Sequence, residues 1–274
     1  MPFTISHAAA ALPLRRLTRD KLPLAALMIG AMSPDFAYFT SFAPERMATH
    51  DLAGVFWFCW PAALCVWLLF VRVLEQPTVA LLPEPWRARF VRKPEQISLR
   101  ALALASVAVV LGAISHIIWD SFTHWNSPVV AALPFLHSKV LDVGGSPVRL
   151  FWLLQHLSSV FGAAVLIRWA WKAPPATLSS SVGSLRYATP VTNPMRVGAA
   201  LALLVTTCAV AINGYLDQPD VSFEMRLFFF AIGGMKGFAI AWTMIAVFID
   251  RYLRTAHVAP ARIALFGRSA PPTY

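Results

Sequence analysis

Charged side chains are scarce in this 274-residue chain: Asp, Glu, Lys and Arg make up 13% of it, and hydrophobic residues make up 58%. An average soluble domain contains about 25% charged residues, so this composition excludes an ordinary soluble domain. The mean hydropathy of +0.62 agrees with that exclusion. The sequence therefore predicts an integral membrane protein with membrane lipid around its helices.

Acidic residues and cysteines are rarer still. The chain has 13 acidic and 23 basic residues, a formal net charge of +10. In so apolar a chain we interpret the basic residues as topology signals and contacts with anionic lipid, and we expect no nucleic-acid partner. The three cysteines lie in apolar runs without the CxxC spacing of a zinc or redox motif, so we interpret them as packing residues.

The chain also lacks a cationic region before its first apolar stretch, which argues against a signal peptide. Residues 1–12 are apolar but too short to cross a bilayer, since a transmembrane helix needs about 20 residues. We expect a short N-terminal interfacial or re-entrant helix there. The fold class predicted is an all-α polytopic membrane helix bundle, with about six transmembrane helices at residues 22–42, 52–74, 99–120, 150–171, 197–216 and 227–250.

Lys and Arg gather in alternate loops, which predicts the topology. By the positive-inside rule, both termini and these loops are cytoplasmic, in what we expect to be a bacterial cytoplasmic membrane. The basic loops are 15–21, 72–100, 168–196 and 251–268. We predict three regions: a membrane domain at 1–172 that carries a candidate metal site, a Pro/Ser/Thr-rich cytoplasmic linker at 173–196, and a C-terminal helix pair with a basic tail at 197–274.

Ligand-type side chains recur at the end of the third predicted span. His116, Asp120 and His124 follow one another at intervals of four residues, and each such step turns a helix by about 40°, so they are expected to share one face. Imidazole nitrogen and carboxylate oxygen are ligands that Zn accepts. The topology places Asp35 and His50 at the same membrane level, which predicts an inward-facing polar cavity.

Other readings of these residues remain open. His116 and Asp120 could form only a hydrogen-bonded pair that joins helices, and Asp35 could cap its helix after Pro34. Lys236, about ten residues into the last span, could pair with an acidic residue such as Asp217 or Asp220, or bind an anion. The further candidates for the polar cavity are Gln155, His156 and Lys236.

The motifs also carry a family resemblance across roughly residues 1–165. They resemble an uncharacterised bacterial membrane family that is catalogued only as a domain of unknown function. The order of ligands is similar to that of predicted membrane-bound metal-dependent hydrolases and, more remotely, of helical zinc-dependent phospholipases C. The motifs are Pro2-Phe3-Thr4-x-Ser6-His7, Ser33-Pro34-Asp35, His50 before an apolar helix, and Ser115-His116-x-x-Trp119-Asp120-Ser121-x-Thr123-His124.

The resemblance implies a divalent metal site made of His7, Asp35, His50, His116, Asp120 and His124. His7 conflicts with the predicted topology, which leaves residues 1–12 a bilayer's thickness from the other ligands. The conflict disappears if the N-terminal segment dips inward, or if residues 22–42 are not a full span. Thr49-His50-Asp51 also departs from the hydrolase pattern, in which Ser often follows this His.

The sequence-based hypothesis is a metal-dependent hydrolase of a lipid or lipid-linked phosphoester. Zn is the expected ion, with Mn or another divalent metal as alternatives, and Asp35 and Asp120 would bridge ions or accept a proton. The alternative is a non-enzymatic membrane protein that binds or transports a metal ion or proton along the same His/Asp layer. A third reading is a structural protein in which the layer only specifies helix packing.

Overall fold

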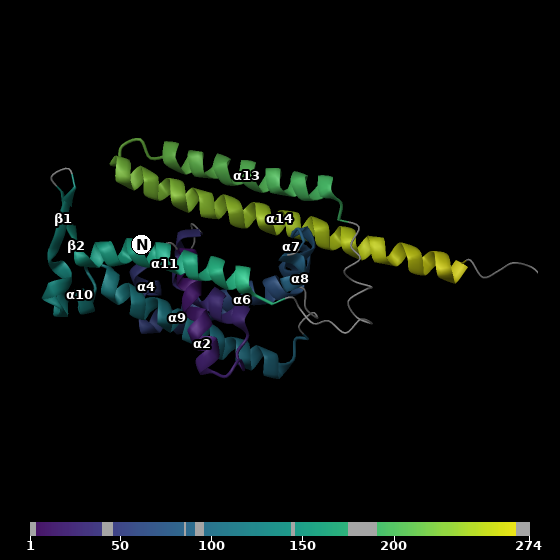
Figure 1. Ribbon diagram of the computed structural model, residues 1–274, viewed down its shortest axis with the longest axis horizontal. Coiled ribbons are helices and arrows are strands. Elements are labelled where there is room, and N and C mark those ends of the chain that lie inside the picture. Colours follow the sequence, from purple (N-terminus) through teal and green to yellow (C-terminus); the bar gives the residue numbers. More distant parts are fainter. Residues whose placement is uncertain are drawn as a thin grey trace, which may run out of the picture. The chain divides into compact units, whose positions relative to one another are not determined.

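The computed structural model describes residues 4–39, 46–84, 86–90, 96–143, 146–174 and 191–266, and these are almost entirely helical (Figure 1). Its strands form one antiparallel hairpin, within which β1 pairs with β2. In chain order the described elements are α1 (Thr4–His7), η1 (Ala8–Ala10), α2 (Ala11–Leu17), α3 (Leu24–Met32), η2 (Ser33–Phe39), α4 (Arg46–Thr49), α5 (Leu52–Gly54), η3 (Val55–Cys59), α6 (Trp60–Leu69), η4 (Phe70–Leu74), α7 (Glu75–Leu81), α8 (Trp86–Phe90), α9 (Leu99–Thr123), α10 (Pro128–Ala132), η5 (Pro134–His137), β1 (Lys139–Val143), β2 (Ser146–Arg149), α11 (Leu150–Lys172), α13 (Asn193–Leu216) and α14 (Phe223–Phe266).

Five helices of the described chain are long and apolar enough to cross a membrane, which confirms the all-α membrane fold class. Within the first predicted span, 22–42, the described residues form the shorter apolar helix Leu24–Phe39, whose last part is the tighter 3-10 helix η2, and residues 40–42 lie outside the described residues. The five long helices are Leu52–Leu81, Leu99–Thr123, Leu150–Lys172, Asn193–Leu216 and Phe223–Thr255.

The chain divides into two compact units. Unit 1 comprises Met1–Leu68 and Gln96–Ala173, and unit 2 comprises Leu69–Glu95 and Pro174–Tyr274. Most of the predicted linker at 173–196 falls on residues 175–190, outside the described residues. In unit 2, α13 and α14 run side by side (Figure 1), and a Cβ placed on Gly233 would lie 2.5 Å from the Val210 carbonyl oxygen. Small residues therefore let these two backbones touch.

In unit 1, glycines hold α3 against α9. A Cβ on Gly30 would lie 2.4 Å from the Val109 oxygen, and one on Gly112 would lie 2.4 Å from the Leu27 oxygen. The two backbones are therefore in direct contact, as in small-residue packing between membrane helices. Because Leu27 meets Gly112 and Ala31 lies beside His116, the helices run in the same direction. This contact brings the turn after α3 to the end of α9.

Replacing Gly112 with alanine is expected to force α3 and α9 apart, because the new methyl group would overlap the Leu27 backbone. Overpacking of this kind costs about 1–3 kcal/mol of unfolding free energy. Thermal unfolding of the purified variant in detergent tests this. Gly198→Ala is the matched control, since no atom of the described residues lies within 4 Å of a Cβ at Gly198. Equal unfolding temperatures for the Gly112 variant and the wild type would contradict the packing.

The N-terminal helices fold back along α3 and form a helical hairpin with it. The Ser6 hydroxyl donates to the Ser159 carbonyl oxygen at 2.7 Å, and a Cβ on Gly162 would lie 2.7 Å from the Ser6 oxygen, so α1 is packed against α11. At the same end, the Thr4 hydroxyl donates to the Asp35 carboxylate. The N-terminal segment therefore lies beside η2, and the separation of His7 from the other ligands by a bilayer's thickness is wrong. The cytoplasmic location of both termini stays a prediction.

Candidate metal centre

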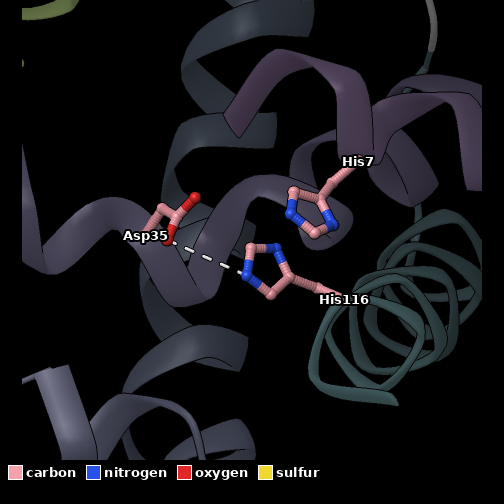
Figure 2. Close-up of side chains that lie close together, drawn as sticks. All are labelled: His7, Asp35 and His116. Carbon is pink, nitrogen blue, oxygen red and sulfur yellow. Dashed lines mark ion pairs between the residues drawn. The ribbon is translucent and has the colours of Figure 1, made fainter. Parts of the chain in front are cut away.

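Five of the six predicted ligands come together at one end of unit 1. His7 ends α1, Asp35 lies in η2, His50 follows α4, and His116 and Asp120 lie on α9. Figure 2 shows the side chains of His7, Asp35 and His116 approaching one another from three different elements. One ligand atom each from His7, Asp35 and His116 lies within 4.8 Å of the others, and the same holds for His50, His116 and Asp120.

The distances between these atoms suit ligands around an ion better than hydrogen bonds. An N–H···O hydrogen bond is about 2.7–3.2 Å long. Two ligands of a tetrahedral zinc, each about 2.0–2.1 Å from the metal, lie roughly 3.3–3.4 Å apart. The contacts at 3.4 Å are His7 Nε2–Asp120 Oδ1, His50 Nε2–Asp35 Oδ1 and His116 Nε2–Asp120 Oδ2; those at 3.8 Å are His50 Nε2–Asp120 Oδ2 and His116 Nε2–Asp35 Oδ1.

His116 is held with its Nε2 lone pair directed at the centre. Its Nδ1 lies 2.8 Å from the Ala31 carbonyl oxygen. Because a carbonyl only accepts, Nδ1 carries the proton and Nε2 is left as a ligand atom. Both three-residue groups include His116, and one Nε2 lone pair binds one ion. The geometry therefore favours a single metal position around His116.

Thr49 orients His50 in the same way. The Thr49 hydroxyl donates to the Pro34 carbonyl oxygen at 3.0 Å, and the same oxygen lies 3.0 Å from His50 Nδ1. Since the hydroxyl proton is already donated, the oxygen accepts from Nδ1–H, which leaves Nε2 of His50 as the ligand atom. Thr4 supports the first carboxylate, because its hydroxyl donates to Asp35 Oδ2 at 2.7 Å and leaves Oδ1 toward His50 and His116.

The two buried carboxylates of the centre carry negative charge that the surrounding solvent cannot compensate. Asp35 is 1% exposed and Asp120 is 6% exposed, so two carboxylates share a site that is nearly closed to solvent. Burial, the largest cause, lowers the pKa of His7 to about 3, so that its imidazole is neutral at neutral pH. Buried charges require a compensating partner. A divalent cation supplies that charge and binds neutral imidazole.

Within the described part of the chain, the buried atoms His7 Nε2, Asp35 Oδ1 and His116 Nε2 have no hydrogen-bond partner. A buried polar atom left unsatisfied costs about 1–3 kcal/mol. All three atoms can donate a lone pair to a metal, and all three belong to the first of the two groups described above. The residues present therefore fit a divalent metal ion.

His124 lies beside Asp120, outside the two three-residue groups. Its Nδ1 is 3.1 Å from the Asp120 carbonyl oxygen and 3.5 Å from Asp120 Oδ2. Because the carbonyl only accepts, Nδ1 carries a proton here and faces the carboxylate as a donor. In this position His124 can orient the Asp120 carboxylate. That His124 itself binds the metal stays a prediction.

The remaining candidates differ in their surroundings. Gln155 is buried on α11, whereas His156 is exposed and its ring lies edge-on to Trp152, with centroids 4.4 Å apart. Lys236 is half-buried in α14 of unit 2. Within the described chain it forms no ion pair with Asp217 or Asp220, so the proposed pairing is wrong for these residues. A role of Lys236 in anion binding stays a prediction.

Sequence reasoning missed Thr4 and Thr49, which orient the ligands. The signal was present, since Thr4 precedes His7 by three residues on one helix and Thr49 directly precedes His50. Thr49→Val is expected to weaken metal affinity about 10- to 100-fold, the usual cost of losing an outer hydrogen bond to a metal ligand. Competition titration against a metal chelator measures this. Thr255→Val, at an exposed position on α14, removes a hydroxyl as a control, and equal effects would contradict the role of Thr49.

The model of the domain of unknown function DUF4184 matches residues 1–247. The chain belongs to this family. The match to DUF4184 includes every residue of the candidate metal centre and extends well beyond residues 1–165, where the sequence motifs lie. No curated protein and no solved structure matches the chain. A functional proposal for this DUF4184 member therefore depends on the chemistry of its site.

Proposed function

We propose that this protein is an integral-membrane metal-dependent hydrolase that acts on a lipid or lipid-linked phosphoester. One observation carries the proposal: His7, Asp35, His50, His116 and Asp120 present ligand atoms in two groups of three that share His116, with His–Asp separations of 3.4–3.8 Å. Nitrogen and oxygen ligands without cysteine suit Zn, and Mn accepts the same set. We place Zn first.

The reaction class follows from the ligands. A divalent ion held here would lower the pKa of a water molecule to about 7 and polarise a phosphoryl oxygen. The imidazoles of His50 and His116 are fixed by Thr49 and Ala31, so their Nε2 atoms stay directed at the centre. Asp35 and Asp120 are the carboxylates within reach of a proton released from water. Carboxylates in this position act as general bases.

The surroundings of the centre support an amphiphilic substrate. The centre lies at the end of α9, a helix long and apolar enough to span a membrane. Two tryptophan side chains near it in the sequence are exposed: Trp119 at 40% and Trp125 at 70%. Such side chains favour the membrane–water interface. A lipid phosphate at that level would reach the centre without leaving the bilayer.

The distribution of buried ionisable groups supports hydrolysis over transport. Among the described residues of unit 1, the buried imidazole and carboxyl side chains are His7, Asp35, His116 and Asp120, all in the centre. A path for ions or protons needs ionisable groups spread through the depth of the membrane. Their concentration at one level is typical of a reaction site.

Turnover of lipid phosphoesters by the purified protein tests this proposal. Protein stripped with EDTA and reloaded with Zn or Mn should release phosphate or a phosphorylated headgroup from a panel of lipid phosphates. His137→Ala is the control for loss of a histidine, since His137 lies outside the centre and contacts Phe151. Metal binding without turnover across the panel would reject hydrolysis and favour a protein that binds or passes a metal ion.

A further inference from the structure

The tip of the N-terminal hairpin, residues 17–22, lies against the first half of α9 and forms an open cavity of about 400 Å³ with it. This volume falls within the range of about 300–1,000 Å³ that is typical of small-molecule sites. The α9 wall consists of Leu104, Val107 and Leu111, which share one helix face at intervals of three and four residues. The hairpin side contributes Leu17, Thr18, Arg19, Lys21 and Leu22.

Two cations at this cavity have no acidic partner in the described part of the chain. The turn contains a single acidic residue, Asp20, whose carboxylate oxygen lies 2.9 Å from Arg15 Nε. Among the described residues, no carboxylate forms an ion pair with Arg19 or Lys21. Both side chains are exposed. An apolar wall therefore faces two positive charges that are available to an anion.

The turn that presents these cations has a defined shape. Arg19 and Asp20 have φ angles of 51° and 57°, a left-handed conformation that costs a non-glycine residue about 1–2 kcal/mol. Backbone hydrogen bonds offset this cost: Asp20 N–H donates to the Arg15 oxygen at 2.9 Å, and Lys21 N–H donates to the Thr18 oxygen at 3.1 Å. The cations therefore extend from a preformed turn, which lowers the entropy cost of binding.

We propose that this cavity binds an anionic phospholipid, with the phosphate between Arg19 and Lys21 and an acyl chain along Leu104, Val107 and Leu111. The aliphatic wall belongs to a membrane-spanning helix, and its Val107 is 52% exposed, which favours a lipid over a soluble anion. Val107 and Asp120 are 13 positions apart on α9, about 20 Å along the helix axis. The lipid site is therefore separate from the metal centre and does not depend on the proposed hydrolase activity.

Native mass spectrometry of the full-length protein in detergent, titrated with dioleoyl phosphatidylglycerol, tests the proposal. Arg19→Gln combined with Lys21→Gln is expected to weaken binding roughly 30-fold, about fivefold for each cation lost. Dioleoyl phosphatidylcholine, with the same acyl chains and no net charge, should bind the wild type at least tenfold more weakly. Equal affinity of the variant and the wild type, or equal affinity for the two lipids, would overturn the proposal.

Three controls separate the lipid site from other causes. Arg168→Gln combined with Lys172→Gln removes two exposed cations from α11 and should leave binding within twofold of the wild type. Val107→Trp keeps both cations but fills the cavity, and should also weaken binding, whereas Val160→Trp on an exposed face of α11 should not. Glycerol 3-phosphate tests for a soluble-anion site: affinity equal to that of phosphatidylglycerol would overturn a phospholipid site.

Discussion

Replacing His116 with alanine is expected to abolish metal binding, with a loss of affinity greater than about 1,000-fold. His116 is 1% exposed, and its Nε2 belongs to both groups of candidate ligands. Its Nδ1 also joins α9 to the Ala31 carbonyl oxygen, so the variant loses a ligand and the contact that aims it. Outer-shell partners alone are worth about 10- to 100-fold in affinity, and removal of the ligand itself must cost more. Elemental analysis of the purified variant measures the loss.

Correct folding of the His116 variant has to be shown separately, because its side chain is fully enclosed. His116→Gln keeps a polar side chain of similar reach and should insert in the membrane and unfold at a temperature close to that of the metal-free wild type. His137→Ala should keep the full metal content, since it lies outside the centre. A His116 variant that folds and retains stoichiometric metal would contradict the assignment.

Asp120→Asn is expected to reduce both metal affinity and turnover by at least about 1,000-fold. The substitution keeps the shape of the side chain but removes one of the two buried negative charges that we expect the ion to balance. Asp120 also has the most contacts in the centre, since its carboxylate lies within 3.4–3.8 Å of nitrogen atoms of His7, His50, His116 and His124. Kinetic assay with a lipid phosphoester and chelator titration measure the two effects.

The same variant has a second signature in its stability. Metal at 100 times its dissociation constant should stabilise the wild type by about 2.7 kcal/mol, whereas the Asp120 variant should gain almost nothing. Without metal, the variant should be at least as stable as the wild type, because it buries one charge fewer. Asp142→Asn, at an exposed pair with Lys139, is the matched control and should respond to metal like the wild type. An equal response of the Asp120 variant would contradict its role.

The spacing of ligand-type residues along the sequence predicted the part of the site that lies on α9. His116 and Asp120 are four residues apart on α9, and a regular helix fixes their relation. The same reasoning fails at His124, because α9 ends at Thr123 and His124 has extended backbone angles, φ −115° and ψ 129°. A face defined by helical periodicity does not continue past the last helical residue. His124 consequently lies beside Asp120 with its Nδ1 toward the carboxylate.

Tertiary contacts determine the part of the candidate metal centre that could not be predicted from the sequence. Hydropathy predicted a full crossing at residues 22–42, but the described helix Leu24–Phe39 is shorter and turns into a 3-10 segment at Ser33. Counting spans then separated His7 from the other ligands by a bilayer's thickness, which is wrong, and only the family resemblance indicated His7 as a ligand. The contacts of Ser6 with α11 and of Thr4 with Asp35 place His7, and they join residues distant in sequence. No local sequence pattern predicts contacts between residues so far apart in the chain.

The metal content of the purified wild-type protein tests the central claim most directly. X-ray absorption at the metal edge, together with elemental analysis, should find about one divalent ion per chain, bound only by nitrogen and oxygen at about 2.0–2.2 Å, with no sulfur at about 2.3 Å. The signal should disappear in His116→Ala and persist in His137→Ala. Wild-type protein that binds no metal after exposure to Zn or Mn, or an ion that His116→Ala retains, would contradict the account.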